Sequence, residues 1–267
     1  MRLITLVAIS LTFGWSPLAA AEAPSRRVWK VEEVTREGLI YAPPGAKSTA
    51  CPVVFAFHGH GGTMLHASRT FAYHTLWPEA IVVYLQGLPT PGMTDPEGKK
   101  PGWQKAIGDQ NDRDLTFFDT VLKSLKTDFQ VDEKRIYATG HSNGGGFTYL
   151  LWAARGETFA ALAPSAGGLG RSFRGLTPKP ALHVAGEMDE IVAFANQKRS
   201  MDFVKTLNNC DAVGTPWAKS GALVGTLYLS KNGNPFVSVI YPGGHKFPAE
   251  APALIVKFFQ EYPATTL

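Results

Sequence analysis

The sequence predicts an α/β domain in which a mostly parallel central sheet is covered by helices on both faces. Short, continuously apolar runs alternate along the chain with segments of helical period. Such runs are typical of strands that are buried on both faces. The length of 267 residues, 45% of them apolar and 18% charged, suits one large domain, which we assign to residues 22–267.

The apolar runs identify the expected strands in order. A loosely alternating edge hairpin over residues 28–42 comes first and ends at Pro43-Pro44-Gly45. The later strands are Val53–Phe57, Ile81–Leu85, Arg135–Thr139, Phe159–Ala163, Ala181–Ala185 and Val237–Tyr241. Helical patterns between them include Asp114–Phe129 and Asn196–Leu207. This alternation is the basis for expecting parallel strands.

The first 21 residues have the pattern of a secretory signal peptide. Arg2 precedes an apolar stretch from Leu3 to Trp15, and small residues end the segment at Leu18-Ala-Ala-Ala21. The apolar stretch is too short for a spanning helix, and no second candidate follows. We therefore expect a secreted or periplasmic protein without a membrane anchor.

The charge of the chain is only mildly basic. Removing residues 1–21 takes away one arginine and no acid, which leaves 25 basic against 22 acidic residues, or +3. The basic residues are dispersed, and the densest cluster is Lys198-Arg199, so nucleic acid is not an expected partner. Two cysteines in an exported chain favour a disulfide, but Cys51 and Cys210 are expected several strands apart, and their pairing stays open.

One segment combines a strand, a glycine-rich turn and a helix. Ser142 stands between Gly140 and Gly144, directly after the strand Arg135–Thr139 and before a helical pattern. A sharp strand-to-helix turn needs glycine at those two places and exposes the serine hydroxyl as a nucleophile. The amide of Asn143 would lie near the helix N-terminus, where it can stabilise an oxyanion.

A second glycine-rich segment, His58-Gly-His-Gly-Gly62, directly follows the strand Val53–Phe57. Its glycines allow backbone amides to turn inward, and the amide of His60 is the candidate for the second oxyanion donor. Metal binding by His58, His60 and His66 is the alternative. No carboxylate or cysteine lies nearby with ligand spacing, so we expect no metal and no cofactor.

An acid and a histidine follow the serine in the order that α/β-hydrolases use. Asp189 lies on the turn after the strand Ala181–Ala185, where Glu187 is its competitor, and His245 is the only histidine after it. His245 occupies a glycine-rich loop after the last strand, from which an imidazole can reach the serine while a carboxylate fixes its tautomer. The sequence thus predicts a Ser142–His245–Asp189 triad.

The segment from Gly87 to Asp112 is too long for a simple connection and is rich in proline and glycine. It leaves the carboxyl end of a strand, the side on which open α/β sheets bind ligands. A large aromatic in such a loop needs something to pack on, so we expect Trp103 to form a wall of the substrate site.

Several segments together resemble the esterase family that contains polyhydroxybutyrate depolymerases, feruloyl esterases and acetylxylan esterases. They are Phe57–Gly62, Tyr84–Pro89, Gly102–Gln104, Val131–Tyr137 and Gly140–Gly145. The resemblance covers nearly all of the mature chain and implies an α/β-hydrolase fold and hydrolysis of esters. It places the nucleophile, acid and base on Ser142, Asp189 and His245, and it makes Trp103 and Gln104 the expected substrate contacts. We see in this sequence no linker or surface-binding domain of the kind that secreted depolymerases of this type often carry, so we do not expect an insoluble polyester as the substrate.

The expected function is that of a monomeric serine esterase acting on feruloyl or acetyl esters of plant polysaccharide. Hydrolysis of polyhydroxybutyrate or hydroxyalkanoate oligomers is the alternative. Two further classes stay open: a non-catalytic binding protein on the same scaffold, and a peptidase of the same fold, although such peptidases usually carry an additional domain.

Overall fold

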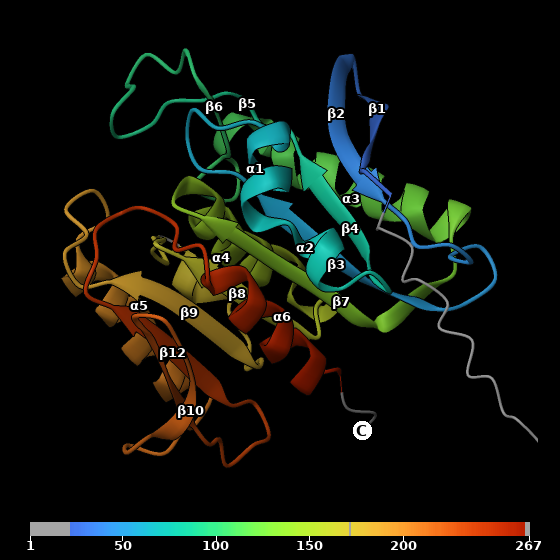
Figure 1. Cartoon of the computed structure of the whole chain (residues 1–267). Helices are drawn as coiled ribbons and strands as arrows, with labels where there is room; N and C mark the ends of the chain where they lie inside the picture. Colours follow the sequence, from blue (N-terminus) through green and yellow to red (C-terminus); the bar gives the residue numbers. More distant parts are fainter. Residues whose placement is uncertain (1–21, 171, 265–267) are drawn as a thin grey trace, which may run out of the picture.

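The structure is a computed structural model that describes residues 22–170 and 172–264. The predicted signal peptide, residues 1–21, lies outside the described residues. In the described part, the chain forms one large sheet, one short hairpin and helices on both sides of the sheet (Figure 1).

The sheet has ten strands within the described residues, in the order β1-β2-β4-β3-β7-β8-β9-β12-β11-β10. Their bounds are β1 Ser25–Val31, β2 Val34–Tyr41, β3 Cys51–Phe57, β4 Ile81–Leu85, β7 Val131–His141, β8 Ala161–Ser165, β9 Ala181–Gly186, β10 Thr215–Ser220, β11 Leu223–Tyr228 and β12 Phe236–Tyr241. The strands from β4 to β12 in that order are parallel, and an antiparallel hairpin is added at each edge. The predicted mostly parallel sheet is confirmed.

Helices cover both faces of this sheet, because its central strands are apolar on both sides. Their bounds are α1 Met64–Phe71, α2 Tyr73–Leu76, α3 Arg113–Asp128, α4 Asn143–Arg155, α5 Phe194–Leu207 and α6 Ala251–Glu261. Along β3, Phe55 and Phe57 pack in the core shared with α3, α4 and α5, whereas Val54 and Ala56 pack in the core shared with α1, α2 and α6. The period-2 alternation of the strand thus supplies two cores from one apolar run.

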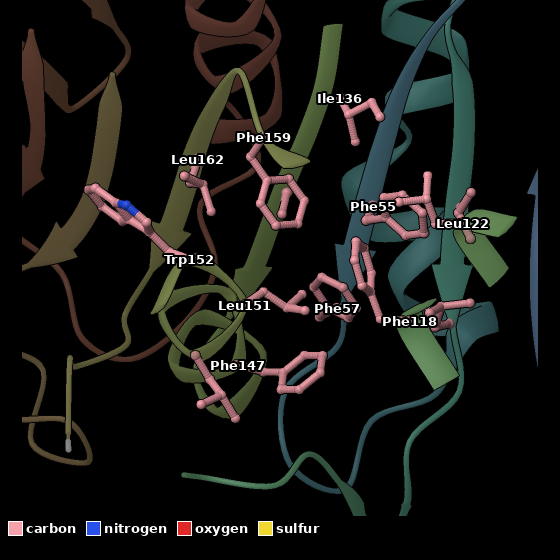
Figure 2. Packing of buried hydrophobic residues seen from close by; sticks show 14 of the residues in the cluster. Phe55, Phe57, Phe118, Leu122, Ile136, Phe147, Leu151, Trp152, Phe159 and Leu162 are labelled. Carbon is pink, nitrogen blue, oxygen red and sulfur yellow. The ribbon is translucent and has the colours of Figure 1, made fainter. Parts of the chain in front are cut away.

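The core on the side of α3, α4 and α5 is dominated by aromatic rings (Figure 2). Phe55 meets Phe118 of α3 edge to face, with ring centres 4.8 Å apart, and Phe57 meets Phe147 of α4 at 5.0 Å. These contacts fix α3 and α4 against β3 in the middle of the sheet.

Several element boundaries differ from the predicted ones. For example, β7 begins four residues before the expected strand Arg135–Thr139 and ends two residues after it. The strand expected at residues 159–163 begins and ends two residues later, and it includes Pro164, which pairs with Gly140 inside the parallel sheet. The hairpin of β10 and β11 was not predicted, because its half-exposed residues form no continuous apolar run. Cys51 and Cys210 are both free thiols, which answers the open question of their pairing.

The parallel strands bring distant loops to one edge of the sheet. His58 follows β3, Ser142 follows β7, Asp189 lies three residues after β9, and His245 follows β12. Because the carboxyl ends of parallel strands share an edge, these four segments converge. None of the described helices is long and apolar enough to cross a bilayer.

Candidate active site

Ser142 occupies a strained turn between β7 and α4. Its backbone angles are φ 58° and ψ −119°, a conformation that side-chain-bearing residues rarely adopt. A Cβ at Gly140 would stand 2.5 Å from the carbonyl oxygen of Gly144, and a Cβ at Gly144 would stand 2.2 Å from that of Phe57. Both glycines are therefore required by the close approach of β3, β7 and α4.

The three residues predicted to act together form a continuous hydrogen-bonded chain. Ser142 Oγ lies 2.7 Å from His245 Nε2, and His245 Nδ1 lies 2.8 Å from Asp189 Oδ2. With Nδ1–H donated to the carboxylate, Nε2 of a neutral imidazole is free to accept the serine proton. The competing acid Glu187 is exposed on the same turn and does not take this place.

Asp189 is held as a buried carboxylate by three N–H donors. It is 4% exposed; its Oδ1 accepts hydrogen bonds from the amides of Ile191, at 3.0 Å, and Val192, at 2.9 Å. Its Oδ2 accepts a third, from Gln197 Nε2 of α5 at 2.9 Å, in addition to the one from His245. These donors satisfy the charge of the carboxylate and fix its orientation toward the imidazole.

A second imidazole, that of His141, lies beside His245, with ring centres 5.1 Å apart. Burial, together with the neighbouring His245, lowers the pKa of His141 to about 4. At neutral pH this side chain is therefore an uncharged packing surface for the base.

The segment from His58 to Gly62 passes directly over the serine. A Cβ at Gly59 would stand 3.3 Å from the Cβ of Ser142. In the described part of the chain, no hydrogen bond engages the amide of His60, and the amide of Asn143 begins α4, where N–H groups lack an intrahelical acceptor. The two amides named as oxyanion donors thus belong to segments that flank Ser142.

The imidazole of His60 is clamped between two glycines. A Cβ at Gly92 would come within 2.8 Å of its ring, and one at Gly102 within 2.7 Å. His60 Nε2 lies 3.2 Å from Asp95 Oδ2, and the same carboxylate oxygen accepts the amide of Lys100 at 2.8 Å. The side chain of His60 is thereby tied to the long loop that follows β4.

The prediction that Trp103 forms an exposed substrate wall is wrong. Trp103 is fully buried; its ring stacks on Phe147 and meets Phe57 edge to face, both with ring centres 5.2 Å away. Its Nε1 donates to the carbonyl of His58 at 2.9 Å, and its backbone N and O pair with the side chain of Asn143 at 2.7 and 3.0 Å. Trp103 therefore packs in the core. It also links the segment that contains His58 and His60 to the start of α4 at Asn143, and these two segments carry the candidate oxyanion donors.

The side chain of Gln104 is also committed to the fold, although this residue borders the pocket. Its Oε1 accepts the amide of Asp114 at 3.0 Å, and its Nε2 donates to Ala106 O and to Asp112 Oδ1, at 3.0 and 2.8 Å. Since Gln104 is fully buried, these contacts do not support the prediction that it binds substrate.

A pocket of about 740 Å³ opens beside Ser142 and His245. One wall comes from the loop between β4 and α3, as predicted, and the other from α5 and from the segment after β8. The side chains that line it include Lys105, Leu169, Ile191, Arg199 and Phe203. The wall is mainly apolar, and no Asp or Glu is among the described residues that line it.

The histidines considered as metal ligands have other partners. His58 Nδ1 donates to the carbonyl of Gly59 at 2.7 Å while its Nε2 accepts from the amide of Gly87 at 3.0 Å, and His66 Nε2 pairs with Thr70 Oγ1 at 3.3 Å. Within the described ranges no group of three or more His, Cys, Asp or Glu is arranged to hold a metal ion.

Sequence reasoning missed three buried residues behind Asp189. They are Gln197 on α5, His183 on β9 and Tyr149 on α4, each fully buried and linked to the next by a hydrogen bond. A signal was present for one of them, since His183 is a single polar residue inside the apolar run Ala181–Ala185.

Comparison with known proteins gives one family match and several relatives. The model of the prolyl oligopeptidase family matches residues 98–170, which include the serine turn. Feruloyl esterase C from Emericella nidulans is 27% identical over 214 residues, which are 79% of this chain and 76% of that protein.

Solved structures of esterases share the fold. The acetyl xylan esterase from Aspergillus awamori superimposes with a TM-score of 0.65 at 13% identity, covering 88% of this chain and 99% of that one. The Bacillus cereus carboxylesterase superimposes with a TM-score of 0.60 at 16% identity, covering 87% and 96%. These proteins are carboxylic ester hydrolases by name, which agrees with the enzyme class predicted from the motifs. The predicted resemblance is thus confirmed: the chain has the α/β-hydrolase fold and is similar in sequence to feruloyl esterases.

Proposed function

We propose that this protein is a secreted or periplasmic, monomeric serine esterase that cleaves carboxylic esters through an acyl-enzyme. The observation that carries the proposal is the chain of 2.7 and 2.8 Å contacts from Ser142 through His245 to Asp189 at the mouth of a 740 Å³ pocket. Export is supported by the signal-peptide pattern of residues 1–21.

The geometry supports a two-step reaction. His245 Nε2 takes the proton of Ser142 as Oγ bonds to the ester carbonyl carbon, and the resulting oxyanion accepts hydrogen bonds from the amides of His60 and Asn143. Collapse of this intermediate breaks the bond to the alcohol oxygen, which receives the proton from His245. Water then repeats the sequence, adds to the acyl group and releases the acid, and Ser142 regains its proton.

The substrate class we propose is a feruloyl or acetyl ester of plant polysaccharide. Phe203, Leu169 and Ile191 give the pocket apolar surface against which an aromatic acyl group can pack, and its volume is in the range of small-ligand sites. The sequence similarity to feruloyl esterase C is consistent with this choice.

A second candidate follows from the charge of the pocket. Lys105 and Arg199 line it, whereas none of the lining residues that the structure describes is an Asp or Glu. A hydroxyalkanoate oligomer ends in a free carboxylate, which these cations would attract, whereas a feruloyl ester of a sugar is neutral. The charge of the wall is therefore the observation that makes the oligomer the second candidate, beside the ester that the apolar lining supports.

The test is hydrolysis of a substrate panel by the wild-type and Ser142→Ala proteins. The panel contains p-nitrophenyl acetate and butyrate, methyl ferulate, acetylated xylan and a hydroxybutyrate oligomer. We expect turnover to fall by roughly 10⁴- to 10⁶-fold in the variant, with the fold retained. Near-normal turnover by Ser142→Ala would refute the mechanism, and a preference for the oligomer would select the second candidate.

The remaining classes are separated by two further measurements. A fluorophosphonate probe labels an activated serine, so failure to label Ser142 would favour a binding protein on a hydrolase scaffold. Hydrolysis of dipeptide amides in preference to aryl esters would favour a peptidase, the class to which the matched family model belongs.

A further inference from the structure

We propose that Tyr149, His183 and Gln197 form a one-way hydrogen-bond relay that positions Asp189 and limits the negative charge that its carboxylate presents to His245. The inference rests on the proposed serine esterase mechanism and concerns residues that do not touch the pocket. It makes them positioning residues for the acid of the triad.

The relay runs from the core to the carboxylate through three elements. Tyr149 Oη on α4 lies 2.8 Å from His183 Nδ1 on β9, and His183 Nε2 lies 3.2 Å from Gln197 Oε1 on α5. Gln197 Nε2 lies 2.9 Å from Asp189 Oδ2, the same oxygen that contacts His245. The reacting serine is thus connected to a tyrosine in the core by consecutive side-chain contacts.

The surroundings of Gln197 fix the direction of every hydrogen bond. Its amide nitrogen faces two acceptors, Asp189 Oδ2 and the carbonyl of Val192 at 2.6 Å, so its oxygen must face His183. His183 then donates from Nε2 and can only accept at Nδ1, where the hydroxyl of Tyr149 is the donor. Each residue donates toward Asp189.

Burial keeps the relay in this state. Tyr149, His183 and Gln197 are all fully buried, so bulk water does not compete for their hydrogen bonds. Burial lowers the pKa of His183 to about 4 and raises the pKa of Tyr149 above its ordinary value. At neutral pH the imidazole is therefore neutral and the phenol keeps the proton it donates.

The effect on catalysis comes from the shared oxygen of Asp189. A donor from Gln197 offsets part of the negative charge that Oδ2 presents to His245, and so makes the imidazolium less stable. Without that donor the carboxylate attracts the imidazolium form of His245 more strongly. The groups that face His245 are Asp189, the neutral His141 of β7 and Ser142, with Lys246 next in the chain.

The test compares Tyr149→Phe and Gln197→Met with the matched control Tyr137→Phe. Tyr137 is also a buried tyrosine of this fold, but among the described residues its hydroxyl has no hydrogen-bond partner. The measurement is kcat/KM for p-nitrophenyl acetate as a function of pH, together with the low-field imidazole proton resonance of His245.

We expect Gln197→Met to lower kcat/KM by roughly 10- to 100-fold and Tyr149→Phe by roughly 2- to 10-fold, as expected for charge-assisted and neutral hydrogen bonds. Both variants should move the acidic limb of the profile to higher pH, on the order of half a unit, and shift the His245 resonance. Tyr137→Phe should change neither.

An unchanged acidic limb and resonance in both relay variants would overturn the inference, even if their melting temperatures fell, because a purely structural role lowers stability without moving the limb. The Ser142→Ala protein separates this outcome from failure of the proposed function. If it is inactive while the relay variants behave as wild type, the relay is refuted and the esterase mechanism stands.

Discussion

The two sides of Ser142 are built from different interactions. On the side of the base, Asp189 is held by backbone amides and by Gln197, in a network of buried polar side chains. On the side of the oxyanion, Trp103 holds the His58 and Asn143 segments together through ring packing and three hydrogen bonds that each use at least one backbone group. On the base side, catalysis depends on how much negative charge Asp189 presents to His245. On the oxyanion side, it depends only on the positions of the neutral amides of His60 and Asn143.

This difference predicts different kinetic signatures. Changes on the base side alter the electrostatics of His245 and should appear in the pH dependence of the rate. Changes on the oxyanion side displace neutral N–H donors, so they should lower kcat equally at every pH within the active range. The following predictions test this separation, in order of decreasing size.

The largest effect is expected on the oxyanion side, for Trp103→Ala. Removing a fully buried indole that stacks on Phe147 should cost about 3–5 kcal/mol of unfolding free energy. Urea denaturation measures this loss, and turnover should fall because the His58 segment loses its anchor. Trp103→Phe is the matched variant: it keeps an aromatic ring but loses the bond to the carbonyl of His58. Wild-type stability and activity in Trp103→Ala would contradict the role of this residue.

The next effect is a loss of stability in acid, to which both sides contribute. Burial lowers the pKa of His58, on the oxyanion side, and of His183, on the base side, from 6.5 to about 4. The unfolded chain therefore binds more protons than the folded one between these pH values. The stability that these two histidines control is fully present well above pH 6.5 and is lost as the pH falls from 6.5 toward 4. Below pH 4 these two groups cause no further loss.

Each of these two histidines should account for about 3 kcal/mol of the loss, from 1.36 kcal/mol per pKa unit. Denaturant titrations between pH 7 and pH 4 measure it. His183→Gln should reduce the slope of unfolding free energy against pH by up to one proton while the contribution of His58 persists. If the slope of unfolding free energy against pH is unchanged in His183→Gln, His183 is not the neutral imidazole that the relay requires.

The smallest effect is expected for Asp95→Asn. Asp95 contacts the imidazole of His60 and accepts the amide of Lys100, which is the main cause that lowers its pKa. The substitution weakens the tie between the loop and the His60 amide, so kcat should fall by roughly 2- to 10-fold. The acidic limb of the pH profile should stay in place. Glu97→Gln, an exposed change in the same loop, is the control, and a shifted limb in Asp95→Asn would break the separation of the two sides.

Features that depend on residues close together in the sequence could be predicted, whereas contacts between residues far apart in the sequence could not. Ser142, Asp189 and His245 each follow the end of an apolar strand, β7, β9 and β12, which is a local pattern in the sequence, and the sheet brings those ends together. Trp103 could not be placed in this way, because its partners His58 and Asn143 lie 45 and 40 residues away in the chain. The partners of His183 on α4 and α5 were hidden for the same reason, since a polar residue in an apolar strand indicates a partner but not which one.

The backbone conformation of Ser142 lowers the stability of the protein at the residue that its proposed activity requires. A positive φ at a residue with a side chain costs of order 1–3 kcal/mol, whereas glycine adopts it freely. Glycine at position 142 would release that strain and remove the nucleophile in one step. Selection for thermal resilience alone would therefore drift toward inactive chains, so any directed evolution of this scaffold must screen for turnover at every round.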